Sequence, residues 1–291
     1  MSASLHPLPS PLPASPPLHL DDRSAPRIAV FDSGVGGLTV VGAVHKAMPW
    51  LGIRFLGDTA RLPYGTKSAE TVVRYAIQAS AALMREPAAA LVVACNTASS
   101  CALPALREIY GVPVLGVIEP GALAAVEATH SGHIGVIGTE RTVASLAYPT
   151  AIAALDPDAV VHSLATPMLV SLAEEGWFDH PATEAALQAY FGPWLADPAV
   201  AKIDTLVLGC THYPVFKAAL GRVLLRLTGR EVRLVDSAQA ITEQLQGLLP
   251  DPPPPGPGQV ELLATDAVER FARVGGLFFP VERASVHLVD L

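Results

Sequence analysis

Cysteines and charged residues are scarce in this sequence. It has three cysteines in 291 residues. An odd and sparse set of thiols cannot form a disulfide framework and fits a reducing compartment, so we expect a cytoplasmic protein. Charged residues make up 16%, and the net charge is −8. A nucleic-acid-binding protein needs a basic face, so this balance disfavours that class and we expect no nucleic-acid partner.

Long apolar runs and targeting signals are also missing. No stretch reaches the roughly 18 unbroken apolar residues of a membrane span, so we expect no membrane association. Residues 1–26 contain seven prolines but neither a basic start nor a continuous apolar segment. They therefore do not resemble a secretory signal, and we predict a disordered, polyproline-like tail.

Apolar residues, in contrast, make up 51% of the chain, which is ample for a buried core. Short apolar runs alternate with segments that have helical spacing, as in residues 68–86, where Ser68 is a candidate N-cap. This alternation predicts an α/β fold with mostly parallel strands. The predicted strands are residues 27–31, 53–57, 91–94, 112–118, 133–138, 205–209, 232–235, 260–265 and 281–291.

The second half of the chain repeats the first half in outline. Strand 133–138 corresponds to strand 27–31, strand 205–209 to 91–94, and strand 232–235 to the strand that ends near residue 118. The offsets are similar and the order is the same, which predicts two related α/β lobes that arose by duplication. The alternative is that all parallel-sheet proteins have self-similar strands.

Polar clusters follow several of the predicted strands, where ligands bind in parallel α/β sheets. Cys95 and Cys210 each stand where a strand gives way to a turn. At a helix N-terminus a thiol is expected to ionise more readily, because the helix dipole favours the thiolate. Cys101, inside a helical run, is interpreted as a small buried hydrophobe. Two thiols at equivalent strand ends of two lobes would face each other across a cleft.

Two opposed thiols fit one kind of chemistry better than others. A cysteine hydrolase would leave the second thiol unexplained, and a disulfide oxidoreductase would favour Cys-x-x-Cys. Proton transfer on both faces of one carbon uses both thiols and inverts the carbon. Asp32 would orient a thiol or the substrate ammonium, or would only cap a helix. His212 would adjust the protonation of Cys210, or would be a hydrogen-bonded interior imidazole.

Signals for metals and cofactors are missing. There is no Cys-x-x-Cys, no G-x-G-x-x-G and no G-x-x-x-x-G-K-[ST], and none of the four lysines has a convincing pyridoxal context. We therefore expect neither a metal nor a cofactor, and the chemistry indicated is cofactor-free racemisation.

Seven motifs in order resemble the glutamate racemase family within the aspartate/glutamate racemase superfamily. They are AVFDSGVGGLTV, GDTARLPYG, VVACNTAS, GVIEPGA, GVIGTERTV, LGCTHYP and LVDSA, and they run from residue 27 to about residue 238. The ending TDAVERFARVGG is also similar. One departure is Thr166, which stands where many members have a cysteine.

The resemblance implies that Cys95 and Cys210 are the acid/base thiols for D- and L-glutamate respectively. Asp32 would assist Cys95, and His212 would assist Cys210. It also implies that neither pyridoxal phosphate nor metal is needed. The residues that would hold glutamate are Asp32, Ser33, Tyr64, Gly65, Asn96, Thr97, Thr139, Thr211 and His212.

The family's fold has two α/β lobes, with the chain crossing over and back. The resemblance places these crossings near Glu119 and near residues 232–236. The expected division is residues 27–118 with 232–291 in one lobe and residues 119–231 in the other.

The resemblance further implies that the product D-glutamate supplies the bacterial cell wall. It makes UDP-N-acetylmuramoyl-L-alanine a candidate activator and a homodimer a candidate assembly. Three rivals stay open at this point: a racemase of aspartate or another amino acid, a non-catalytic two-lobed amino-acid-binding protein, and a partner-inhibiting protein of the kind that binds DNA gyrase.

Overall fold

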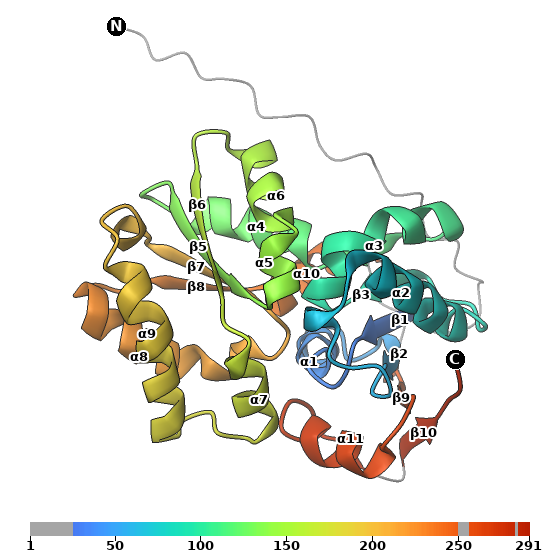
Figure 1. The fold of residues 1–291 in the computed structure, drawn as a ribbon. Coiled ribbons are helices and arrows are strands. Elements are labelled where there is room, and N and C mark those ends of the chain that lie inside the picture. The colour runs from blue at the N-terminus through green and yellow to red at the C-terminus, as the bar shows by residue number, and fades with distance from the viewer. Residues whose placement is uncertain (1–25, 250–255, 283–284) are drawn as a thin grey trace, which may run out of the picture.

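A computed structural model describes residues 26–249, 256–282 and 285–291. The predicted proline-rich tail falls outside the described residues except for Pro26, as does part of the proline-rich segment 251–258. The described chain forms two parallel sheets with helices packed around them, one sheet in each of two lobes (Figure 1). The predicted α/β class is therefore confirmed.

The first sheet has six strands in the order β10-β9-β2-β1-β3-β4. β1 and β3 are buried at almost every position, as expected for a parallel sheet covered on both faces. The strands are β1 (Arg27–Asp32), β2 (Gly52–Gly57), β3 (Ala90–Val93), β4 (Val114–Gly116), β9 (Val260–Ala264) and β10 (Val286–Leu288).

The second sheet has four strands in the order β6-β5-β7-β8. They are β5 (His133–Gly138), β6 (Val160–Ala165), β7 (Thr205–Gly209) and β8 (Arg233–Asp236). The order β6-β5-β7-β8 repeats β2-β1-β3-β4 of the first sheet. The sequence matched β5 with β1, β7 with β3, and β8 with β4. The two strands of each pair also occupy the same position in their sheets.

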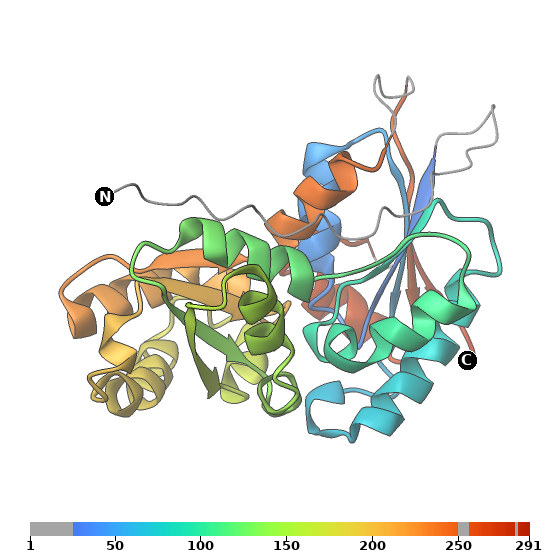
Figure 2. The same cartoon turned by 90° about the horizontal axis from the view of Figure 1, so that it is seen from above.

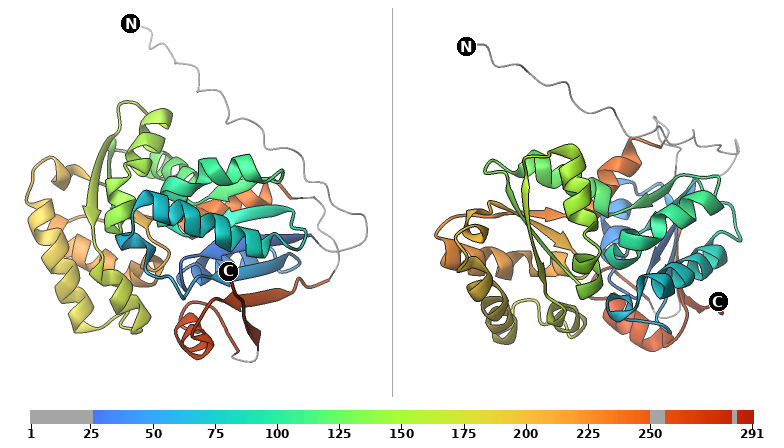
Figure 3. Two further views of the ribbon diagram at one scale, coloured as in Figure 1. Left: turned by 45° about the vertical axis from the view of Figure 1, so that its right-hand side comes forward. Right: turned by 45° about the horizontal axis from the view of Figure 1, so that its top comes forward.

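The helices of the first lobe follow its strands. They are α1 (Leu38–Ala47), η1 (Tyr64–Thr66), α2 (Ala69–Leu83), α3 (Asn96–Ile109) and α11 (Val268–Gly275). Ser68 is the N-cap of α2, and its side chain accepts a hydrogen bond from the Thr71 amide, as predicted. The C-terminal elements α11 and β10, drawn in red, lie with the first lobe in both views of Figure 3.

The second lobe contains a larger set of helices in the described chain. They are α5 (Glu140–Ala144), α6 (Ala147–Leu155), α7 (Met168–Glu174), α8 (Pro181–Leu195), η2 (Val200–Lys202), η3 (Tyr213–Phe216) and α9 (Lys217–Thr228).

Two further helices cross between the lobes. α4 (Ile118–Ala128) follows the last strand of the first half, yet Ile118 and Ala122 pack into the core of the second lobe. α10 (Ser237–Gln246) follows β8 of the second sheet, yet Ile241 and Leu245 pack into the core of the first lobe. Figure 2 shows α10, in orange, beside α1, in blue. Each lobe thus contains a helix that directly follows a strand of the other lobe's sheet.

The pairing of β8 differs from the predicted division of the chain. That division placed residues 232–291 in one lobe, but β8 pairs with β7 in the second sheet. The reason is that the chain crosses only after Asp236, where α10 begins. We propose that the lobe boundaries lie at the starts of α4 and α10. The first boundary agrees with the predicted crossing near Glu119, and the second lies at the end of the predicted range 232–236.

Three elements differ from the sequence prediction, and one of them is the last strand, where only Val286–Leu288 of the predicted 281–291 form β10. The run 112–118 forms only the short strand β4, because Ile118 already begins α4. Strand β6 was not predicted, because it is an edge strand whose residues are at most half-buried and include His162 and Ser163. In the part of the chain that the structure describes, no helix is both long and apolar enough to cross a membrane.

The crossing of α10 predicts a stability effect. Leu245 is fully buried on α10, so Leu245→Ala should lower the free energy of unfolding by about 2–5 kcal/mol through a cavity in the first-lobe core. The matched control is Leu225→Ala on α9, where the side chain is 49% exposed and the change should stay within about 0.5 kcal/mol. Urea unfolding measures both values. Equal effects of the two substitutions would contradict the packing of α10 described above.

Candidate active site

A cavity of about 330 Å³ lies where the carboxyl ends of the strands of both sheets meet. Its size suits a small molecule, and residues from both lobes line it. Ten of the eleven site residues predicted from the sequence line this cavity: Ser33, Tyr64, Gly65, Cys95, Asn96, Thr97, Thr139, Cys210, Thr211 and His212. The eleventh, Asp32, is fully buried behind it.

Cys95 follows β3 and forms the N-cap of α3. Its sulfur accepts a hydrogen bond from the Ala98 amide at 3.4 Å, and its thiol donates to Ser33 Oγ at 3.4 Å. Burial, together with the nearby charge of Asp32, raises the pKa of the Cys95 thiol to about 12. The expected ease of ionisation at this helix N-terminus is therefore wrong for Cys95, because desolvation outweighs the amide hydrogen bond. Cys95 holds its proton at neutral pH.

Asp32 is the last residue of β1. Its Oδ2 accepts a hydrogen bond from the Gly34 amide at 3.0 Å, and Thr211 Oγ1 from the other lobe donates to its Oδ1 at 3.5 Å. The N-cap of α1 is Gly37, so the helix-capping alternative for Asp32 is wrong. A Cβ on Gly37 would lie 2.5 Å from Asp32 Cβ, which explains the glycine. Burial raises the pKa of Asp32, and the charge of His212 opposes this rise.

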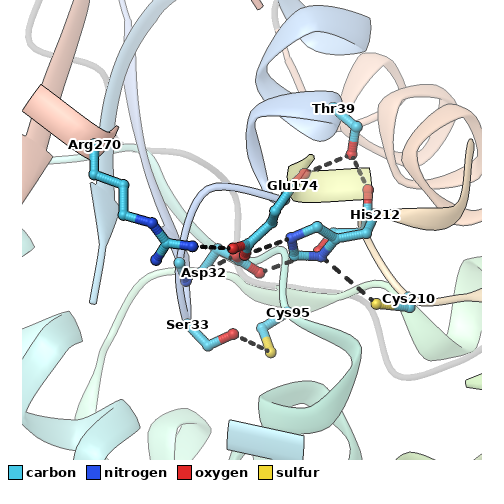
Figure 4. Close-up of polar contacts among 11 residues, drawn as sticks. Asp32, Ser33, Thr39, Cys95, Glu174, Cys210, His212 and Arg270 are labelled. Atoms are coloured by element: carbon cyan, nitrogen blue, oxygen red, sulfur yellow. Dashed lines mark hydrogen bonds and ion pairs between the residues drawn. The ribbon is translucent and has the colours of Figure 1, made fainter. Parts of the chain in front are cut away.

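Cys210 belongs to a second group of polar side chains, separate from Cys95 and Ser33 (Figure 4). Its sulfur lies 3.8 Å from His212 Nδ1, and on the other side of the ring Glu174 Oε1 lies 3.3 Å from His212 Nε2. Arg270 on α11 donates to Glu174 Oε2 at 2.7 Å. This row of side chains joins the thiol of the second lobe to a helix of the first lobe.

The charges around His212 decide its protonation. Burial lowers the pKa of the imidazole, but the contacts with Cys210 and Glu174 and the charge of Asp32 outweigh it and raise the pKa to about 10. His212 therefore carries a proton at neutral pH and can exchange it with Cys210 across their contact. The alternative was that His212 is only a hydrogen-bonded imidazole of the protein interior. That alternative does not account for the contact between its ring and the Cys210 thiol in the cavity wall.

A buried carboxylate holds the first-lobe wall of the cavity. Tyr64 donates its hydroxyl hydrogen to Asp58, and Arg61 Nε donates to the same carboxylate at 2.7 Å. Gly65 lies against Thr139 of the second lobe, where a Cβ on the glycine would come within 2.8 Å of Thr139 Cβ. The glycine thus permits the two lobes to meet at this wall.

Sequence reasoning missed part of the site. The sequence did not place Glu174 in the site, yet its side chain is 15% exposed and lies 3.3 Å from His212. No local signal marks Glu174, since its partners are far away in the sequence. The other lining residues not predicted are Gly34, Leu62, Pro63, Thr66, Glu140, Pro167, Val170 and Ser171. Cys101 is half-buried on α3 and is not among the residues that line the cavity.

The pairing of Glu174 with His212 predicts a pKa change. Glu174→Gln removes an anion next to the ring and leaves Arg270 without its carboxylate, and both effects disfavour the imidazolium. The pKa of His212 should therefore fall from about 10 toward neutrality. Nuclear magnetic resonance (NMR) titration of ring-labelled histidine measures it. Glu175→Gln, at the exposed neighbouring position, is the control and should leave this pKa unchanged. An unchanged value in Glu174→Gln would remove Glu174 from this role.

Comparisons with known proteins agree with one another. The family model for Asp/Glu/Hydantoin racemase matches residues 43–245. The glutamate racemase of Geobacter metallireducens is 45% identical over 91% of this chain and 96% of its own length.

Among solved structures, glutamate racemase isoform RacE1 from Bacillus anthracis has a TM-score of 0.82 at 36% identity, covering 91% of this chain and 98% of that one. The Escherichia coli glutamate racemase, solved in complex with L-glutamate and the activator UDP-MurNAc-ala, has a TM-score of 0.71 at 31% identity. It covers 92% of this chain and 99% of the other. From the site geometry and these likenesses, the chain belongs to the Asp/Glu/Hydantoin racemase family, in its glutamate racemase branch.

Proposed function

We propose that this amino-acid racemase interconverts L- and D-glutamate by transferring the α-proton between two cysteine thiols. One observation carries the proposal. Cys95 from the first lobe and Cys210 from the second line one small cavity, and each has its own polar partners. Two acid–base groups on separate lobes can address opposite faces of one carbon.

The proton transfers balance in both directions. With L-glutamate, the Cys210 thiolate removes the α-proton, and the Cys95 thiol donates its own proton to the opposite face of the carbon. D-Glutamate leaves, with Cys210 now a thiol and Cys95 a thiolate. Reaction of D-glutamate reverses these steps. The raised pKa of Cys95 supports its role as proton donor toward L-glutamate, and His212 supplies or accepts a proton at Cys210.

The α-proton of an amino acid is far less acidic than a thiol, so the cavity has to stabilise the developing carbanion. Donors aimed at the substrate carboxylate in a buried site do this most effectively. Asp32, buried and linked to Thr211, would orient the substrate ammonium. The proposed donors and binding side chains are Ser33, Tyr64, Gly65, Asn96, Thr97, Thr139, Thr211 and His212.

The remaining proposals concern the setting of the reaction. D-Glutamate would supply peptidoglycan, and the cytoplasm is the proposed compartment because Cys95, Cys101 and Cys210 are all free thiols. A homodimer stays a prediction. UDP-N-acetylmuramoyl-L-alanine is proposed as an activator, supported by the E. coli complex with UDP-MurNAc-ala.

Isotope exchange tests the substrate and the activator together. In D₂O without pyridoxal phosphate, L-glutamate should gain α-deuterium and lose optical rotation, whereas L-aspartate should do neither, as followed by NMR and polarimetry. UDP-N-acetylmuramoyl-L-alanine should increase the rate, and an equal rate without it would reject the activator. Exchange of aspartate alone would favour the aspartate rival. Stabilisation by glutamate without any exchange would favour the binding-protein rival.

Substitution of each thiol tests the two-base mechanism. Cys95→Ala and Cys210→Ala should each lower racemisation in both directions by at least about 10²–10⁴-fold, since each direction needs both groups. Residual α-proton exchange should persist only for L-glutamate in Cys95→Ala and only for D-glutamate in Cys210→Ala. Cys101→Ala is the matched control, because this thiol lies outside the cavity lining, and it should retain the full rate. A normal rate in Cys95→Ala would refute the two-thiol mechanism.

A further inference from the structure

Only one of the two polar atoms in the Asn96 side-chain amide has a hydrogen-bond partner among the described residues. Asn96 lines the cavity beside Cys95 and is 2% exposed. Its Oδ1 accepts a hydrogen bond from the Tyr148 hydroxyl at 2.7 Å. Its Nδ2 is buried and has no partner among the described residues. A buried, unpaired donor in a cavity wall is costly unless a ligand accepts from it.

Tyr148 reaches this amide from the other lobe. It lies in the first turn of α6 and is 1% exposed, within the second-lobe core. Burial raises the pKa of the Tyr148 phenol, and the side chain of Ser237, the first residue of α10, opposes this rise. The Tyr148 hydroxyl donates its single hydrogen to Asn96 Oδ1.

The ring of Tyr148 packs against two glycines, whose lack of a Cβ leaves space for it. A Cβ on Gly121 of α4 would lie 3.3 Å from the Tyr148 hydroxyl oxygen, and a Cβ on Gly209 would lie 3.1 Å from ring atom Cε2. Gly209 immediately precedes Cys210, and Asn96 immediately follows Cys95. One phenol thus lies against the crossing helix α4 and against the neighbours of both thiols.

We propose that Tyr148 is a positioning residue for racemisation, which holds the Asn96 amide so that Nδ2 points to a carboxylate of the substrate. An asparagine amide has nearly the same shape in its two flipped orientations, so its hydrogen bonds decide which atom faces the cavity. With the Tyr148 hydroxyl present, the carbonyl is engaged and the NH₂ group is presented. Without it, the amide is free to present its oxygen, which repels a carboxylate. This inference rests on the proposed contact of Asn96 with glutamate.

Tyr148→Phe removes only the hydroxyl and retains the ring between the two glycines. The Michaelis constant (KM) for L- and D-glutamate should rise about tenfold, as expected for one misoriented hydrogen bond to a charged group. Asn96→Ala should raise it at least as much. Asn96→Asp should raise it further, because a carboxylate that accepts from Tyr148 has no donor to turn toward the cavity. The control is Tyr110→Phe, where a hydroxyl bonded to Ser80 Oγ at 3.2 Å is removed away from the cavity, and KM should not change.

A double-mutant cycle separates positioning from a general structural role. If Tyr148 acts through Asn96, Tyr148→Phe should change KM by less than about twofold in the Asn96→Ala background. Multiplying effects in the double variant would overturn the inference, as would a wild-type KM in Tyr148→Phe. A wild-type KM in Asn96→Ala would reject the substrate contact and this inference with it. Failure of the wild-type protein to racemise glutamate would instead reject the proposed function.

Discussion

The exchange of helices between the two lobes is the constraint on which the rest of the structure depends. α4 directly follows β4 of the first sheet but packs into the core of the second lobe. α10 directly follows β8 of the second sheet but packs into the core of the first lobe. Each lobe is therefore incomplete without a segment contributed through the other. Because the exchange occurs directly after β4 and β8, it brings the carboxyl ends of both sheets to one place. The cavity forms there as a consequence of the topology.

The two thiols differ in their surroundings although their positions in the sheets are equivalent. Cys95 has a hydroxyl and an amide beside it and a buried carboxylate behind it, so its proton is retained. Cys210 has an imidazole beside it that burial alone would make neutral. Glu174 and Arg270 alter that balance from helices of different lobes. The two thiols thus occupy equivalent positions in the two sheets but have different polar neighbours.

The parts of the fold that were predicted from the sequence are those with local signals. The strands at 133–138 and 205–209 have the predicted bounds because continuous apolar runs mark strands buried on both faces. Cys95 and Cys210 were found because polar residues directly after such runs fall at the ligand-binding edge of a sheet. β6 has no such run.

The residues that were missed act through contacts distant in sequence. Glu174 lies on a short helix, and its role depends on His212 and on Arg270, which is 96 residues away. Tyr148 has the pattern of an ordinary core aromatic, and only the fold brings its hydroxyl to Asn96, 52 residues earlier. The second lobe boundary that we propose lies after the predicted one, because strand pairing at Arg233–Asp236 is not visible in the local pattern.

Inversion of a carbon requires two acid–base groups that approach it from opposite sides. The loops at one edge of a single parallel sheet all extend in the same general direction, so one lobe alone would offer both groups to the same face of a ligand. Two sheets with their ligand-binding edges facing each other remove this restriction. The site must then be held across the lobe boundary, and the hydrogen bonds from Thr39 to the carbonyl of Thr211 and between Thr97 and Thr139 do so beside the cavity. A protein that inverts a carbon with two side chains and no cofactor is therefore expected to place them on separate lobes, and the matching strand orders of the two sheets give the two side chains equivalent positions.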